Sequence, residues 1–187
     1  MQRRGRYWSR VAALVLASML SAAPGLAQQV DVKGEKEVIA LGQKLDRAGA
    51  SGHAGQVSGK IVDQWKGTPF RFDAAGAPRE LTTQDVQHLR LKRFGYGEIS
   101  ILLALAAKQP DASKAKSLNE ILAMRQAGSG WGKIAHALGY PSLGAVKRSV
   151  KATEAGVERV AASGRAQNLS RLEKADRTDK PAKAEQR

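Results

Sequence analysis

The stretch FGYGEIS at residues 94–100 returns almost unchanged as SGWGKIA at residues 129–135, and both contain Gly–aromatic–Gly–charged–Ile. When the chain is aligned with itself at an offset of 35 residues, Thr82–Leu103 matches Ser117–Leu138 without a gap. The two segments share five identical and seven chemically similar residues, whereas chance would give about one or two identities. The alignment therefore predicts a duplicated unit.

Each copy carries the signals of two helices joined by a tight turn. Thr82 and Ser117 are good N-cap residues, and an acidic residue three positions later completes a capping box in each copy. Gly95 and Gly130 then allow the turn that ends the first helix. We interpret the glycine pairs as the corners of two helical hairpins. The corner residues are Gly95, Tyr96, Gly97 and Ile99 in the first copy and Gly130, Trp131, Gly132 and Ile134 in the second.

The second glycine of each pair lies inside the second helix of its hairpin, where glycine costs about 1 kcal/mol relative to alanine. Its presence at Gly97 and again at Gly132 indicates the close approach of another helix, or room for a neighbouring ring. The aromatic residues are in helical phase with the isoleucines that follow them, which favours burial over an exposed ligand-stacking surface.

The regions around the duplication are less regular. Residues 28–80 are predicted to be helical and irregular, with a short helix over Glu35–Arg47. Residues 81–152 form the duplicated domain, in which each hairpin is expected to cover the apolar face of the other, and a further helix follows from about Leu143 to Ala152. Residues 153–187 are predicted to be a flexible basic tail. The fold class is mainly α: two tandem helix-turn-helix hairpins of period 35 with flanking helices and a disordered C-terminal tail.

The first 27 residues have the pattern of a cleaved signal peptide. Four arginines precede the apolar run Val11–Ala23, and small residues at Gly25 and Ala27 suit cleavage after Ala27. The run is shorter than the roughly 20 residues that a membrane-spanning helix needs. The chain has 31 Lys and Arg against 17 Asp and Glu, so losing the four arginines leaves a net charge of +10. The expected location is the periplasm or the exterior.

Motifs of catalysis, metal binding and cofactor binding are missing from the sequence. There is no cysteine, and His53, His88 and His136 are not at metal-ligand spacing. No serine lies in a GxSxG elbow, and the acidic residues form no obvious acid–base pair. Gly128–Gly132 opens a helix and could cradle an anion, but a helix and not a strand precedes it, and the Gly-Lys-Ser/Thr sequence of a P-loop does not follow. A non-enzymatic protein without a cofactor or metal is expected.

The positive charge favours anionic partners: an envelope polymer, a membrane surface or an acidic protein. Arg90 and Arg125 occupy equivalent repeat positions and either cap the C-terminal ends of their helices or contact anions. With Lys147 and Arg148 they are the candidate anion contacts. The sequence specifies no partner, and it predicts a binding or structural module of the cell envelope.

The two corners also carry a family resemblance. Gly95–Ile99 and Gly130–Ala135 resemble the GYGEI and GWGxIA segments of a group of small exported bacterial proteins, and the likeness extends over about Leu81–Leu138. The resemblance implies an all-helical envelope protein and adds no activity.

A second resemblance supports the alternative of a nucleic-acid-binding protein. Leu118–Val150 resembles the helix-turn-helix of resolvase-like DNA-binding domains, in which the last helix enters the major groove. Val146 comes one residue too late for the tight turn of that motif, and Pro141 and Gly144 lie where the recognition helix should begin. Export from the cytoplasm would also keep the protein away from duplex DNA, which makes nucleic acid the less favoured partner.

Overall fold

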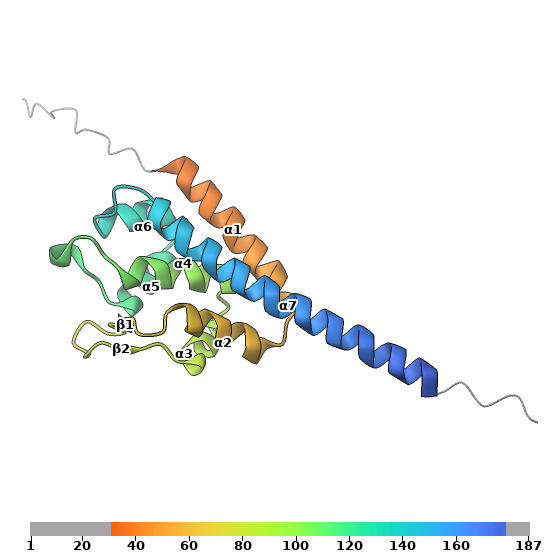
Figure 1. Cartoon of the computed structure of the whole chain (residues 1–187). Helices are drawn as coiled ribbons and strands as arrows, with labels where there is room; N and C mark the ends of the chain where they lie inside the picture. Colours follow the sequence, from red (N-terminus) through yellow and green to blue (C-terminus); the bar gives the residue numbers. More distant parts are fainter. Residues whose placement is uncertain (1–30, 179–187) are drawn as a thin grey trace, which may run out of the picture.

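The computed structural model describes residues 31–178 and is built almost entirely from helices (Figure 1). The signal peptide predicted for residues 1–27 lies outside the described residues. The mainly α fold class is confirmed, because helices make up 70% of the structure and the described residues contain one two-stranded sheet. The helices are α1 (Val32–Ala50), α2 (Ala54–Gln64), α3 (Thr83–Leu91), α4 (Tyr96–Ala107), α5 (Leu118–Gln126), α6 (Trp131–Ala137) and α7 (Gly144–Thr178); the short strands are β1 (Pro69–Phe70) and β2 (Arg79–Glu80), and a 3₁₀ turn η1 covers Ala112–Lys114.

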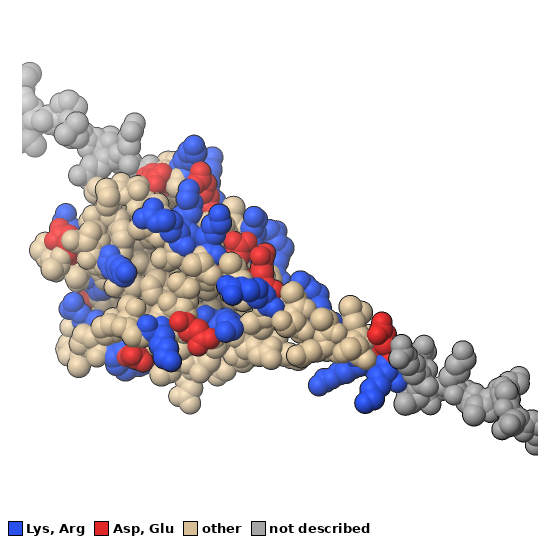
Figure 2. Space-filling view, viewed as in Figure 1, with Lys and Arg blue, Asp and Glu red and all other residues tan. Residues whose placement is uncertain are grey.

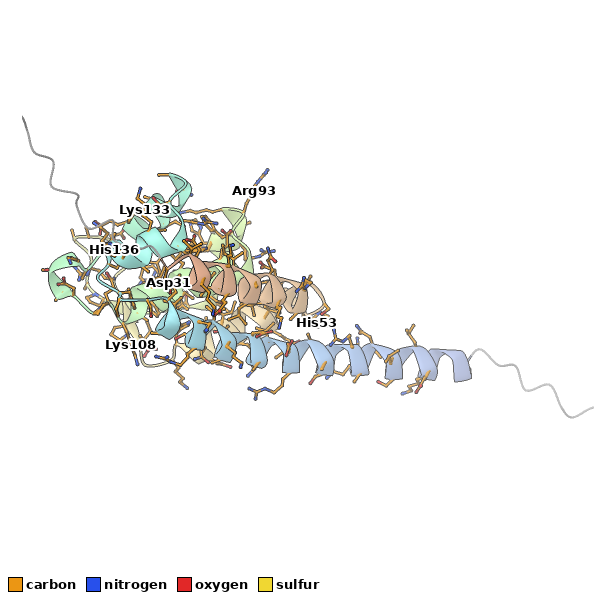
Figure 3. The ribbon with its side chains drawn as sticks, turned by 90° about the horizontal axis from the view of Figure 1, so that it is seen from above. Asp31, His53, Arg93, Lys108, Lys133 and His136 are labelled. Atoms are coloured by element: carbon orange, nitrogen blue, oxygen red, sulfur yellow. The ribbon has the colours of Figure 1, made fainter. Side chains whose placement is uncertain are left out.

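The apolar helix α4 is at the centre of the fold. Its residues from Ile99 to Leu105 are all buried, so it is surrounded on every side. Two helices from opposite ends of the chain, α1 and α7, lie side by side over it (Figures 1 and 3). Residues of α1 and α2, such as Leu45 and Ile61, share one core with the duplicated segment.

The helices α1 and α7 run parallel, and three contacts fix their register. At their starts, the backbone N–H of Leu143 donates to Asp31, at 3.1 Å. One turn later Lys147 donates to Glu37 at 2.5 Å, and near the end of α1 Arg165 donates to Ser51 at 3.2 Å. The pairing therefore extends along the whole of α1.

Both predicted hairpins are present, as α3–α4 and α5–α6, and both predicted capping boxes are confirmed. The hydroxyl of Thr82 accepts from the backbone of Asp85, whose carboxylate accepts in return, and Ser117 and Glu120 repeat the arrangement. The residues that end the first helices differ from the prediction. Gly95 and Gly130 have extended backbones and are the N-caps of the second helices. Positive φ angles occur two residues earlier in each copy, at Arg93 (68°) and Gly128 (84°).

The expectation that the two hairpins cover each other is wrong in its main part. The helices α4 and α5 do touch, but the larger apolar surface of α4 is covered by α1 and α7. The prediction failed because α1 begins before Glu35 and ends after Arg47, and its buried face alternates leucine and valine with glycine. Val38, Gly42, Leu45 and Gly49 form that face, so the apolar pattern of α1 looks weak in the sequence.

The prediction of a flexible tail from residue 153 is also wrong for residues 153–178, because they belong to α7. Val146 and Val150 face inward as expected, but α7 continues for 35 residues without a break. Thr153, Val157 and Ala161 extend its buried face. Apart from Val157, the residues that extend this face are small or polar, which is why the composition suggested a tail. Residues 179–187 lie outside the described part of the chain.

Candidate functional site

The first repeat corner is fitted against α1. A Cβ atom at Gly97 would collide with the backbone of Gly42 on α1, so the two helices approach to backbone contact there. The carboxylate of Asp46 accepts a hydrogen bond of 3.1 Å from the backbone N–H of Gly97. The paired glycines of the first corner therefore serve a close helix crossing, one of the two roles that their spacing indicated.

The second corner is held by the same helix, three turns earlier. The carboxylate of Glu35 accepts a hydrogen bond of 2.7 Å from the backbone N–H of Trp131. Glu35 and Asp46 are eleven residues apart, so they lie on one face of α1. A carboxylate at a helix N-terminus satisfies free N–H groups and interacts favourably with the helix dipole. The two equivalent N-termini are thus occupied by acidic side chains of this chain.

Two of the candidate anion contacts, Arg90 and Arg125, also hold the corners together. The guanidinium of Arg90 lies 4.4 Å from the ring centre of Tyr96, and that of Arg125 lies 4.6 Å from the ring centre of Trp131. Arg90 donates to the carbonyl of Phe94 at 2.8 Å, and Arg125 donates to the equivalent carbonyl four residues after it, at 3.4 Å.

Arg125 makes one further contact, to Glu98 at 2.8 Å, which joins the second hairpin to the first. A cavity of about 290 Å³ opens beside these corners, where Asp46, Glu98 and Arg125 contribute its charged groups. Those groups already bond to one another or to the backbone. The corners therefore behave as structural joints, as the duplication suggested.

A second group of charged residues lies where α1 and α7 run side by side. We call it the basic seam. Figure 2 shows Lys and Arg side chains over α1 and α7 with acidic side chains among them, and in the sequence these cations recur at helical spacing on both helices. Two surface grooves, one at each end of the pairing, contain most of its side chains. The basic seam consists of Lys33, Glu37, Lys44 and Arg47 from α1 and Lys147, Lys151, Glu158 and Arg165 from α7.

The acidic side chains at the start of the basic seam are used within the fold. The hydrogen bond from Lys147 lowers the pKa of Glu37, and the nearby charge of Lys147 lowers it further. Backbone hydrogen bonds from Gly34 and Leu143 lower the pKa of Asp31, which caps α1 beside the basic seam (Figure 3). Both carboxylates are therefore ionised at neutral pH and hold the two helices in register.

At the other end of the basic seam, most of the cations have no acidic partner within the described part of the chain. A groove of about 540 Å³ has Ala48, Ala161 and Ala162 on its walls and Lys44, Arg47 and Arg165 around them, with Glu158 as its one acidic residue. Among the described residues, Lys44, Arg47 and Lys151 have no ion-pair partner within 4.0 Å. Lys44, Arg47 and Arg165 line the same groove, and an anionic partner bound there would relieve the repulsion among their like charges.

The structure does not bring the four candidate anion contacts together. Arg90 and Arg125 belong to the repeat corners, Lys147 lies in the basic seam, and Arg148 is exposed next to it on α7. Sequence reasoning missed the cations of α1 and the contribution of Arg165. A signal was present, because Lys33, Lys36, Lys44 and Arg47 follow the spacing of one helix face.

The segment that resembles a helix-turn-helix forms α5, α6 and the first turns of α7. Leu143, Val146 and Val150, which lie where that motif places its recognition helix, are buried in the core. The hydrogen bond between Lys147 and Glu37 shows that α1 lies along one side of this helix. The exposed residues of its first turns include Arg148 and Lys151.

Within residues 31–178, no group of three His, Asp or Glu side chains is arranged to hold a metal ion. His53 precedes α2 and His136 lies in α6, far apart in Figure 3. In the same part of the chain, no helix combines the length and apolar character needed to cross a membrane.

No protein-family model matches the chain, and searches of curated proteins and of solved structures find no match either. The assignment of a function therefore depends on the residues of this chain.

Proposed function

We propose that the protein is an exported, non-enzymatic binding protein of the cell envelope, and that its basic seam binds an anionic partner. The observation that carries this proposal is that three cations of the paired helices α1 and α7, Lys44, Arg47 and Lys151, form no ion pair with an acidic side chain of the described residues. The signal pattern in residues 1–27 and the net charge of the mature chain support the location and the sign of the partner.

The dimensions of the basic seam favour an extended partner over a single small ion. The seam follows α1 for most of its 19 residues, which corresponds to about 28 Å of helix. Its cations are spread along this length and do not converge on one point. Such an arrangement suits a polymer or a surface with repeated negative charges, and its binding should weaken as salt screens the charges.

The direct test uses a soluble polyanion, dextran sulfate, and the mature chain from Gln28. We expect binding whose affinity falls steeply between 50 and 300 mM NaCl. Over this range the Debye length falls from about 14 Å to about 6 Å, so the charges are screened over progressively shorter distances. The double substitution Lys44→Glu/Arg47→Glu should lower the affinity at least tenfold. Lys66→Glu/Lys92→Glu is the matched control, because it makes the same charge change at exposed residues near α2 and α3. Equal loss in both variants, or none in either, would refute the basic seam as the site.

Export is tested separately by cell fractionation and N-terminal sequencing of the purified protein. The proposal requires an envelope fraction and a mature N-terminus near Gln28. A cytoplasmic chain that retains Met1 would refute the location.

Duplex DNA is the second candidate, and the exposed side chains of Arg148 and Lys151 at the start of α7 favour it. A DNA-binding assay at increasing salt examines this candidate. Affinity that depends on Arg148 and on the DNA sequence would favour a helix-turn-helix role over the envelope role.

A further inference from the structure

The last part of α7 extends beyond the rest of the fold (Figure 1). Gly164 is the last buried residue of α7, Arg165 still reaches Ser51, and Gln167 lines a groove with α2. From Arg165 to Lys174 every side chain is exposed. Two of these residues are leucines, Leu169 at 63% and Leu172 at 67% exposure. Because Leu169 and Leu172 are three residues apart, they form a small apolar patch on one face of the projecting helix.

The two leucines continue the basic seam. Along α7, the positions of Lys147, Lys151, Glu158, Arg165, Leu169 and Leu172 differ by three, four or seven residues. Residues at these spacings share one face of an α-helix. Where it lies beside α1, this face of α7 carries Lys147, Lys151 and Arg165 together with the buried Glu154 and the exposed Glu158, and where it projects it is apolar.

We propose that the anionic partner of the basic seam is the surface of an anionic lipid bilayer, with α7 lying in the interface and Leu169 and Leu172 inserted among the lipids. This inference rests on the proposed function and narrows it to one class of partner. A hydrated polyanion offers the leucines no apolar environment. A bilayer interface offers negative headgroups to the cations and acyl chains to the leucines, which is the combination that amphipathic interfacial helices use.

The acidic residues on this face limit how α7 can lie against an anionic surface. Glu37 is paired with Lys147, so it does not oppose an anionic surface. Glu158 lies among Lys44, Arg47 and Arg165 in the groove. Glu173 follows Leu169 by one turn and is exposed, so it borders the apolar part of the face. Replacing Glu173 with glutamine should therefore strengthen binding to anionic vesicles by a small factor.

The projecting segment also has a physical reason to respond to lipid. Helices without tertiary contacts are marginally stable in water, because each residue gains little beyond one backbone hydrogen bond. Burial of the two leucines in the interface would stabilise the segment beyond Arg165. Its backbone amides should then exchange more slowly with solvent.

The decisive experiment compares two probes for the same variants of the mature chain: dextran sulfate, and vesicles containing one-third phosphatidylglycerol in phosphatidylcholine. Pure phosphatidylcholine vesicles serve as the neutral reference. The test variant is Leu169→Ala/Leu172→Ala, which keeps good helix formers in α7. Leu91→Ala is its control, because Leu91 is 83% exposed on α3, outside the basic seam.

We expect anionic vesicles to bind the mature chain and the control equally, and the leucine variant to bind them at least tenfold more weakly. Its affinity for dextran sulfate should be unchanged, and neutral vesicles should not bind. Hydrogen exchange of residues 166–174 should slow on anionic vesicles, which the leucine variant should abolish.

The possible failures are distinguishable. One outcome is that dextran sulfate binding requires Lys44 and Arg47, while vesicles either do not bind or bind the leucine variant as well as the unaltered chain. That outcome would overturn the lipid inference and leave the proposed function in place. If the unaltered chain binds neither dextran sulfate nor anionic vesicles, both the proposed function and the lipid inference are overturned.

Discussion

The backbones of Gly42 on α1 and Gly97 on α4 touch where the two helices cross. A Cβ atom at Gly97 would lie 2.2 Å from the carbonyl oxygen of Gly42, so the crossing has no room for a larger residue at Gly97. A Cβ atom at Gly42 would make ordinary van der Waals contacts, 3.4 Å from the side chain of Ile101 and 3.5 Å from the backbone of Gly97. This contact sets the position of α1, and α1 in turn carries half of the basic seam. A small change at the crossing should therefore affect both stability and binding.

Gly97→Ala should destabilise the protein by about 2 kcal/mol or more, since overpacking a tight backbone contact commonly costs about 1–3 kcal/mol. Urea denaturation of the chain from Gln28, followed by far-UV circular dichroism, measures the change in the free energy of unfolding. Gly59→Ala is the matched control, because Gly59 lies in α2 with no atom within 4 Å of its missing Cβ. The control should be stabilising by about 0.5–1 kcal/mol, since alanine is favoured over glycine inside a helix. Equal effects of the two substitutions would show that the crossing is not tight.

Arg93→Gly should stabilise the first hairpin. Arg93 has a φ of 68°, and the equivalent residue in the second copy is a glycine with a φ of 84°. A left-handed backbone conformation costs a residue other than glycine roughly 1 kcal/mol, and glycine avoids this cost. Part of the gain is lost because glycine has more conformational freedom in the unfolded chain. The expected gain is about 0.5 kcal/mol in urea denaturation. Gly128→Ala should have the opposite sign, and a loss of stability in Arg93→Gly would contradict this interpretation.

The duplication was visible in the sequence because it depends on residues whose roles are local. Thr82 and Ser117 need only the acidic residue three positions later to form a capping box, and the structure has both boxes. The residues of α1 that contact the repeat corners could not be predicted from the sequence. Glu35 and Trp131 are 96 residues apart, and no local pattern connects them. The basic seam was missed for the same reason, since it exists only after α1 has been placed beside α7.

The two acidic residues that cap the repeat corners should contribute independently. Glu35 accepts from Trp131 and Asp46 accepts from Gly97, on different turns of α1. Substituting each with alanine should cost about 1 kcal/mol, as for other helix N-caps. The double variant should show the sum within about 0.5 kcal/mol, because the two contacts share no atoms. A double-mutant cycle in urea checks this, and strong coupling would indicate that α1 moves as a unit when either contact is lost.

Tyr140→Phe should destabilise the end of α4. The hydroxyl of Tyr140 lies 2.8 Å from the carbonyl oxygen of Lys108 and 3.0 Å from that of Leu105, where α4 has no further N–H groups to offer. Burial raises the pKa of Tyr140 to about 12, so the hydroxyl remains a donor at all ordinary pH values. Losing this hydrogen bond while its carbonyl acceptors remain should cost about 1–2 kcal/mol, measured by urea denaturation. Wild-type stability in this variant would mean that water replaces the hydroxyl.

Acid should weaken the first repeat through Asp85. Burial alone would raise the pKa of Asp85, but hydrogen bonds from Arg79 and Thr82 outweigh it and lower the pKa from 3.8 to about 2. Because the pKa is lower in the folded state, the ionised carboxylate stabilises the fold above pH 4, and this stabilisation is lost as the pH falls from 4 to 2. A shift of this size corresponds to about 2 kcal/mol.

The test is to follow the free energy of unfolding between pH 5 and pH 2 for the mature chain and for Asp85→Asn. We expect the variant to be less stable at pH 5 and to lose less stability on acidification, since asparagine cannot be protonated in this range. Glu120→Gln is the matched change in the second copy, where hydrogen bonds from Ser117 lower the pKa of Glu120. Its effect should be smaller, because the side chain of Glu120 is 44% exposed and that of Asp85 is 18% exposed. Identical pH profiles for Asp85→Asn and the unaltered chain would show that the ion pair with Arg79 contributes nothing to folding.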